Sequence, residues 1–231
     1  MSIALGHPRL HLRHTDSTNT RARELAAAGA PHGTVVTAAE QSAGRGRQGR
    51  TWTAPPGRAL LCSVLVRDPP RLLPLLAGAA VAQVVGPQAQ VKWPNDVLIG
   101  GRKVAGILVE GRPHERWAVV GVGVNVALRP SDFPAELRER ATSMGLSPDA
   151  IEPTLLHLLD ALGARLSRSP EEILEEIRGL DALRGHSVRW SGGQGRAEGI
   201  DGEGRLLVTT DDGPRALDAG EVHLVEATGA A

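Results

Sequence analysis

Three glycines in the segment Gly44-Arg-Gly-Arg-Gln-Gly49 restrict the fold of this chain, because they match a dinucleotide-binding fingerprint only if a helix follows them. Residues 34–40, which precede them, have the apolar, β-branched character of a strand. Residues 50–57, which follow, include two successive prolines and cannot begin a helix. The sequence therefore disfavours a dinucleotide-binding fold and predicts a loop at this position.

The side chains of this loop predict binding of a small anion. Arg45, Arg47 and Arg50 can each form paired hydrogen bonds with a carboxylate or a phosphate. Trp52 offers a flat apolar surface for a planar base. Glycines let the backbone approach a ligand closely. We expect a flexible loop that orders over a bound anion, and a solvated polar turn is the structural alternative.

A non-enzymatic nucleic-acid-binding module that uses the Arg-Gly loop is the functional alternative. The chain has 26 basic and 26 acidic residues and a sequence pI of about 7.1. A neutral balance disfavours a broad basic surface, although it allows a local basic patch. We therefore expect no DNA partner.

Lysine is scarce, since only Lys92 and Lys103 occur among the 26 basic residues. Lysine is a compact point charge that arginine does not replace, so both positions are candidates for a site. Asn95 and Asp96 are residue types that hold Mg²⁺ beside substrate phosphates, although Pro-Asn-Asp also forms ordinary turns. A Gly100-Gly101 hairpin would return Lys103 to these two residues.

The remaining pattern predicts an α+β protein with two domains, residues 1–181 and residues 182–231. We expect helices at residues 20–28, 72–85 (interrupted near Pro74), 152–168 and 171–178, and strands at residues 10–14, 34–40, 59–66, 90–93, 97–99, 103–110 and 117–126. Short strands at residues 187–190, 205–210 and 221–225, separated by glycine-rich turns, predict a small β-barrel.

The single cysteine, Cys62, lies in an apolar run and is expected to be a buried packing residue. No signal peptide is evident, and the apolar run at residues 72–85 is too short to span a bilayer. We expect a cytoplasmic protein without a membrane partner.

Five segments within residues 10–128 together resemble the biotin–protein ligase family. They occur in the same order and at the same spacing as the corresponding motifs of that family. They are Asp16-Ser-Thr-Asn19, Gln41 with residues 44–50 and Trp52, Lys92-Trp-Pro-Asn-Asp96, Lys103 with Gly106-Ile-Leu-Val-Glu110, and Gly121-Val-Gly-Val-Asn125. The tail resembles the family's small C-terminal domain. The resemblance implies a mixed β-sheet flanked by helices, like that of biotin and lipoate ligases and class II aminoacyl-tRNA synthetases, plus an SH3-like β-barrel.

The same resemblance implies a two-step reaction. Biotin and MgATP give biotinyl-5′-AMP, and biotin then passes to a lysine of the biotin carboxyl carrier protein domain of acetyl-CoA carboxylase. Biotin and ATP with Mg²⁺ are substrates, and no tightly bound prosthetic group is implied. A lipoate or octanoate ligase or transferase of the related fold is the enzymatic alternative, although a polar pocket end at Ser17, Thr18 and Gln41 favours biotin.

Site residues are carried over from the resemblance position by position. Those implied for biotin are Ser17, Thr18, Asn19, Gln41, Arg45, Gly46, Arg47, Lys103, Gly106, Gly121 and Gly123; those for ATP are Arg45, Arg47, Arg50, Trp52, Asn95, Lys103 and Asn125. Lys103, Arg47 and Asp96 are the expected catalytic residues, and Asn95 and Asp96 the expected Mg²⁺ ligands.

Three departures from the family pattern modify these expectations. The few residues before Leu10 leave no room for a DNA-binding helix-turn-helix, so we expect a monofunctional ligase. An aliphatic residue replaces an aromatic near Leu61, which would alter the floor of the biotin pocket. An arginine that some members place near Val225 is absent, which weakens the case for contact between the barrel and ATP. An exposed sheet edge would permit a homodimer.

Overall fold

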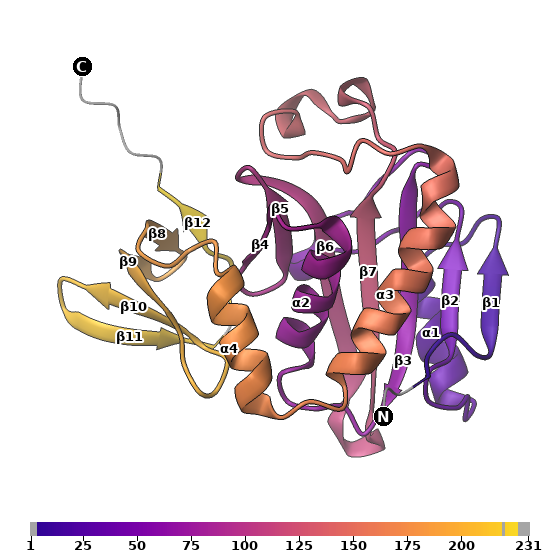
Figure 1. Ribbon diagram of the computed structural model, residues 1–231, viewed down its shortest axis with the longest axis horizontal. Coiled ribbons are helices and arrows are strands. Elements are labelled where there is room, and N and C mark those ends of the chain that lie inside the picture. The colour runs from indigo at the N-terminus through magenta and orange to yellow at the C-terminus, as the bar shows by residue number, and fades with distance from the viewer. Residues whose placement is uncertain (1–3, 219, 226–231) are drawn as a thin grey trace.

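Runs of valine, leucine and alanine build a seven-stranded mixed sheet at the centre of the protein, whose computed structural model describes residues 4–218 and 220–225 (Figure 1). The spatial order is β1-β2-β3-β7-β6-β5-β4, in which β1 and β2 are parallel and every other neighbouring pair is antiparallel. The strands are β1 (Arg9–Leu12), β2 (Val35–Ala38), β3 (Ala59–Arg67), β4 (Ala89–Lys92), β5 (Asp96–Ile99), β6 (Arg102–Arg112) and β7 (Trp117–Asn125).

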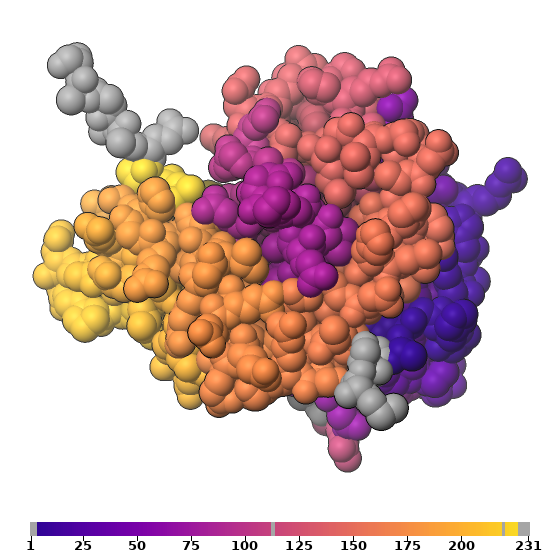
Figure 2. Space-filling view, viewed as in Figure 1, coloured from indigo at the N-terminus to yellow at the C-terminus, as the bar shows by residue number. Residues whose placement is uncertain are grey.

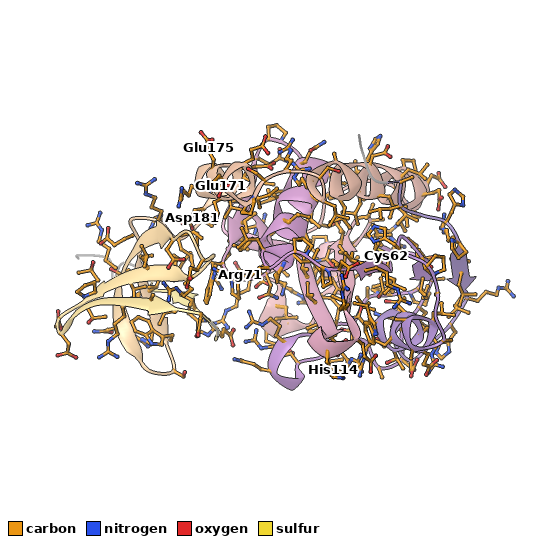
Figure 3. All side chains as sticks on the ribbon, turned by 90° about the horizontal axis from the view of Figure 1, so that it is seen from below. Cys62, Arg71, His114, Glu171, Glu175 and Asp181 are labelled. Atoms are coloured by element: carbon orange, nitrogen blue, oxygen red, sulfur yellow. The ribbon has the colours of Figure 1, made fainter. Side chains whose placement is uncertain are left out.

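Helices cover both faces of this sheet, which explains why β3 and β7 are buried along almost their whole length (Figure 3). One face carries α1 (Thr18–Ala27), whose Ala22 and Ala26 pack against the sheet. The opposite face carries α2 (Leu73–Val85), α3 (Ile151–Arg165) and α4 (Pro170–Leu180). The expected α+β architecture is confirmed.

Proline and serine define where two of these helices begin. In α4, the Ser169 side chain accepts a hydrogen bond from the Glu172 N–H, and the Glu172 carboxylate accepts one from the Ser169 N–H. Pro74 lies in the first turn of α2, where its missing N–H breaks no helical hydrogen bond. The expected interruption near Pro74 was therefore wrong, because this proline opens the helix.

The C-terminal part forms a five-stranded antiparallel sheet with the order β11-β10-β9-β8-β12, consistent with the small barrel expected from the sequence. Its strands are β8 (Ser187–Trp190), β9 (Gly193–Ile200), β10 (Leu206–Thr210), β11 (Gly213–Leu217) and β12 (His223–Leu224). The glycine-rich residues of β9 and β11 were expected to form turns. In β9, a side chain at Gly195 would place its Cβ 2.3 Å from the Thr209 carbonyl oxygen, so close strand pairing requires glycine there.

The two sheets share one hydrophobic core. The Trp93 Nε1–H donates to the Gly204 carbonyl at 3.0 Å, and the Ala182 N–H donates to the Val91 carbonyl at 3.0 Å. Buried Ile200 and Leu206 belong to the same apolar cluster as Trp93. Figure 2 shows the C-terminal sheet in contact with α4, and Asp181 marks their junction in Figure 3. The predicted domain boundary between residues 181 and 182 falls at this junction.

No helix in the described part of the chain is long and apolar enough to cross a membrane.

Candidate active site

A cavity of about 110 Å³ lies on the α1 side of the large sheet, beneath residues 41–52, which we call the arginine loop. Of the sixteen residues predicted for the site, fifteen line the cavity. The exception is Asn125, which is 5% exposed and whose Nδ2 donates to the Thr142 carbonyl at 2.9 Å. The predicted contact between Asn125 and ATP is therefore not supported by its position.

Glycines form the floor of the cavity because side chains above them approach the sheet closely. Gly106 and Gly123 are register partners on β6 and β7. A Cβ at Gly123 would lie 2.5 Å from Cε2 of Trp52, and one at Gly121 would lie 2.1 Å from Oδ1 of Asn19. The glycine pattern of β7 therefore leaves space for Trp52 and Asn19.

A buried polar cluster closes one end of the cavity, where α1 begins. Gln41 Oε1 accepts hydrogen bonds from the Thr18 backbone N–H at 2.7 Å and from its hydroxyl at 3.0 Å. The hydroxyl of Ser63, which is fully buried, lies 2.8 Å from Thr18 Oγ1 and 2.6 Å from Asn19 Oδ1. This end of the cavity can both donate to and accept from a polar ligand.

The arginine loop is a short irregular hairpin. The Trp52 N–H donates to the Gly44 carbonyl at 2.9 Å, and the Gly46 N–H donates to the Arg50 carbonyl at 2.7 Å. At its tip Gln48 has a positive φ of 55°. A side chain at Gly44 would place its Cβ 2.3 Å from the Trp52 carbonyl oxygen. The sequence had predicted a flexible loop, and these backbone hydrogen bonds were not foreseen.

The arginines of the loop are paired within the molecule. Arg45 Nη2 lies 2.8 Å from Glu110 Oε2, and Arg47 Nη1 donates to Asn95 Oδ1 at 3.2 Å. Arg50 forms an ion pair with Glu221. Three partners on three separate segments of the chain give the loop a fixed place over the cavity, which disfavours the interpretation of these arginines as a free nucleic-acid-binding arm.

The β5–β6 hairpin brings Lys103 to Asp96, as the sequence predicted. Gly100 and Gly101 have φ values of 54° and 76°, which suit a two-residue turn. Lys103 Nζ lies 2.7 Å from Asp96 Oδ1 and 5.6 Å from the centre of the Trp52 ring. The ammonium group thus lies between a carboxylate and an aromatic face.

Five cationic side chains line the cavity, against two carboxylates, those of Asp96 and Glu221. Burial lowers the pKa of Lys92, and the nearby Asp96 carboxylate opposes that effect. Burial also lowers the pKa of Arg47. The excess of positive charge suits a ligand that carries several negative charges.

Lys92 was expected only as a candidate for a site, and residues 220–222 had no predicted role in one, yet all of them line the cavity. The scarcity of lysine was a signal for Lys92, since both lysines of the chain lie in this site. Leu61 and Cys62 of β3 also line it. Burial raises the pKa of the Cys62 thiol to about 12, so this cysteine is a packing residue, as expected.

Among the residues that the structure describes, no group of three or more His, Cys, Asp or Glu side chains could hold a metal ion. The oxygen of Asn95 accepts from Arg47, and its Nδ2 donates to the Ile107 carbonyl at 3.0 Å. Asp96, the other predicted Mg²⁺ ligand, pairs with Lys103.

Comparison with known proteins identifies the family to which this chain is similar. Residues 12–126 match the biotin/lipoate A/B protein ligase family, and residues 194–225 match the biotin protein ligase C terminal domain. The bifunctional ligase/repressor BirA of Bacillus subtilis is 36% identical over 240 residues, which cover 93% of this chain and 74% of that protein. The biotin--[acetyl-CoA-carboxylase] ligase of Mycobacterium tuberculosis is 35% identical, covering 91% of this chain and 86% of that protein.

A solved structure gives the same result. The biotin protein ligase from Aquifex aeolicus in complex with biotin and ATP superimposes with a TM-score of 0.82 at 29% identity, covering 96% of this chain and all of that chain. The chain belongs to the biotin/lipoate A/B protein ligase family. The relatives from Mycobacterium tuberculosis and Aquifex aeolicus are named as biotin ligases, so the resemblance inferred from the motifs is confirmed.

Proposed function

We propose that the protein is a biotin–protein ligase, which activates biotin as biotinyl-5′-AMP and transfers biotin to a carrier lysine. The observation that carries this proposal is a single cavity with a neutral polar cluster at one end and clustered cations over the rest. The relatives described above support the same reaction, and the structure in complex with biotin and ATP supports both substrates.

The polar cluster favours biotin over lipoate or octanoate. A cyclic urea presents N–H donors and a carbonyl acceptor, which match the side chains of Thr18 and Gln41. The ends of lipoate and octanoate have no comparable groups. A site built to hydrogen-bond its substrate rejects an analogue that leaves its buried polar groups unpaired.

The cations serve the first step. A carboxylate oxygen of biotin attacks the α-phosphorus of ATP, and the bond from that phosphorus to the bridging oxygen breaks to release pyrophosphate. Two unit negative charges about 4 Å apart repel by about 4 kcal/mol at an effective dielectric constant near 20. Lys103 and Arg47 offset this repulsion and stabilise the charge that develops in the transition state. In the second step the carrier amine attacks the acyl carbon, loses a proton, and AMP leaves.

ATP occupies the part of the cavity beneath Trp52, with its phosphates toward Arg50 and Lys92. Mg²⁺ enters as part of MgATP, with Asp96 as the protein carboxylate beside it. The contact of residues 220–222 with the cavity places the C-terminal part near this end.

The partner is the biotin carboxyl carrier protein domain of acetyl-CoA carboxylase, in keeping with the relatives that are named for that carboxylase. Cytoplasmic location and the absence of a DNA partner complete the proposal. A homodimer could form through β1, which lies at one edge of the large sheet.

Pyrophosphate exchange tests the proposal directly. The protein is incubated with labelled pyrophosphate, MgATP and either biotin or lipoate, and label entering ATP is measured. Exchange with biotin, followed by biotinylation of one carrier lysine detected by mass spectrometry, is the expected result. Exchange with lipoate alone would contradict the proposal.

A further inference from the structure

We propose that Glu110 is a positioning residue that fixes the arginine loop to the start of α1, and this inference rests on the proposed function. Glu110 does not line the cavity, so it acts through the residues that it holds. Its Oε2 accepts hydrogen bonds from Arg45 Nη2 and from Asn19 Nδ2, each at 2.8 Å. One carboxylate oxygen therefore joins the loop to the helix.

The hydrogen bonds of Glu110 complete a continuous series of polar contacts between the arginine loop and the start of α1. Gln41, at the start of the arginine loop, binds Thr18, and Thr18 and Asn19 both contact the buried hydroxyl of Ser63. Asn19 then leads through Glu110 back to Arg45 in the same loop. The loop is thus held at two points, and Glu110 supplies the negative charge that holds Arg45.

Glu110 also fixes the orientation of the Asn19 amide. Asn19 Nδ2 donates to both Glu110 Oε2 and the Leu108 carbonyl, which lies at 3.2 Å. A flipped amide would direct its oxygen at two acceptors, so the carboxylate keeps Oδ1 toward Ser63. Amide orientation follows from such networks.

The orientation of the Asn19 amide determines which acceptors receive the hydroxyl protons of Thr18 and Ser63. Three contacts, Thr18–Gln41, Thr18–Ser63 and Ser63–Asn19, compete for the two protons of the Thr18 and Ser63 hydroxyls. When Ser63 donates to Asn19 Oδ1, the Thr18–Ser63 contact at 2.8 Å can be made only by the Thr18 proton, while Gln41 keeps the Thr18 backbone N–H. Glu110 thereby sets the direction of the hydrogen bonds that run from Thr18 through Ser63 to Asn19.

The test combines loop mobility with kinetics in Glu110→Gln, which removes the charge and keeps the size. Amide hydrogen exchange of residues 42–52 in the ligand-free full chain is expected to rise about tenfold, since a charge-assisted hydrogen bond is lost. The KM for biotin is expected to rise about tenfold, with kcat changed by less than about threefold. Exchange in β3 and β6 should stay unchanged.

Two control variants isolate the effect. Arg23→Gln removes a group that approaches the same carboxylate at 3.4 Å but is not part of the loop. Glu24→Gln makes the same chemical change on α1, where Glu24 pairs with Arg21. Both controls are expected to leave the exchange of residues 42–52 at the wild-type rate.

Arg45→Gln supplies the second measurement if Glu110→Gln does not fold. It breaks the same bond from the loop side and must raise loop exchange to the same extent. In the double variant the effects on loop exchange must be non-additive. Wild-type exchange in either single variant, or additive effects in the double variant, would overturn the inference. If the wild type makes no biotinyl-5′-AMP, the proposed function fails, whereas loop exchange still decides the role of Glu110.

Discussion

Lys103 and Asp96 form an ion pair across the β5–β6 hairpin, with 2.7 Å between Nζ and Oδ1. The lysine that we assign to the carboxylate of biotin is therefore already paired with a protein carboxylate. The ammonium group has three N–H donors, so Lys103 can bind the substrate carboxylate while it keeps its contact with Asp96. The pair therefore holds the Lys103 side chain in place at the cavity.

Replacement of Lys103 is expected to stop the first step. Lys103→Ala should lower biotin-dependent pyrophosphate exchange by at least about 100-fold, because a fixed positive charge at the reacting oxygens is lost. Thermal unfolding serves as the control for folding, since Lys103 is a partly exposed residue of a hairpin. Near-normal exchange in a folded variant would remove Lys103 from the mechanism.

A methyl group at Gly123 is expected to displace Trp52. The new Cβ would lie 2.5 Å from the Trp52 ring, so the ring must leave the floor of the cavity in Gly123→Ala. We expect the KM for ATP to rise about tenfold, in line with the loss of one aromatic contact of roughly 1–3 kcal/mol. Gly202→Ala is the matched control, because nothing lies within 4 Å of a Cβ at that position. Equal KM values in the two variants would contradict the role of Trp52.

Stability near the start of α1 should depend on pH through Asp16. Hydrogen bonds from the Arg21 side chain and the Ser17 N–H lower the pKa of Asp16 from 3.8 to about 2. Because the folded pKa is depressed, the stabilisation is fully present above about pH 4 and is lost as the pH falls toward about 2. The Asp16 side chain is 43% exposed, so the contribution stays below about 1 kcal/mol.

The comparison of wild type with Asp16→Asn in urea measures this effect. The difference in unfolding free energy should be present near pH 6 and shrink in the acid range. Glu24→Gln, which changes another partner of Arg21, controls for loss of charge on the same helix. A difference that is constant across this range would rule out the titration of Asp16 as its origin.

Loss of Glu176 is expected to destabilise the layer of helices. Arg165 on α3 is 3% exposed, and its Nε donates to Glu176 Oε2 on α4 at 3.1 Å. Glu176→Ala would leave a buried guanidinium without its carboxylate, at a cost of about 3–5 kcal/mol. Glu175→Ala on the outward face of α4 is the control, and Figure 3 shows this side chain directed away from the protein. Equal midpoints of denaturant unfolding in the two variants would contradict this account.

The site was predictable to the extent that its residues lie in short local motifs. The two-residue turn at Gly100-Gly101 has a defined geometry, so the approach of Lys103 to Asp96 followed from the sequence. The glycines of β7 indicated that another group approaches this strand closely. They did not indicate that the group consists of Trp52 and Asn19 of the same chain. The contribution of residues 220–222 depends on how the C-terminal sheet packs, which no local pattern encodes.

The strands were predicted where apolar residues alternate or run together, and missed where glycine dominates. In β9 the glycines serve strand pairing, although the same residues favour turns in isolation. Glu110 was visible as the last residue of a motif. The hydrogen bonds that Glu110 accepts from Arg45 and Asn19 span 65 and 91 positions of the sequence, so only the folded chain brings these partners together.

The hydrogen bond from Trp93 to Gly204 bears on whether the large sheet and its helices can fold without the C-terminal sheet. Trp93 stands next to Lys92 in the wall of the cavity, and its indole N–H donates to Gly204, in the turn between β9 and β10. A chain cut at residue 181 would expose this indole together with Leu72 and Leu75, whose side chains lie close to Gly204. We therefore expect residues 4–181 alone to be unable to fold into an active ligase, which makes the C-terminal sheet a structural part of the active site.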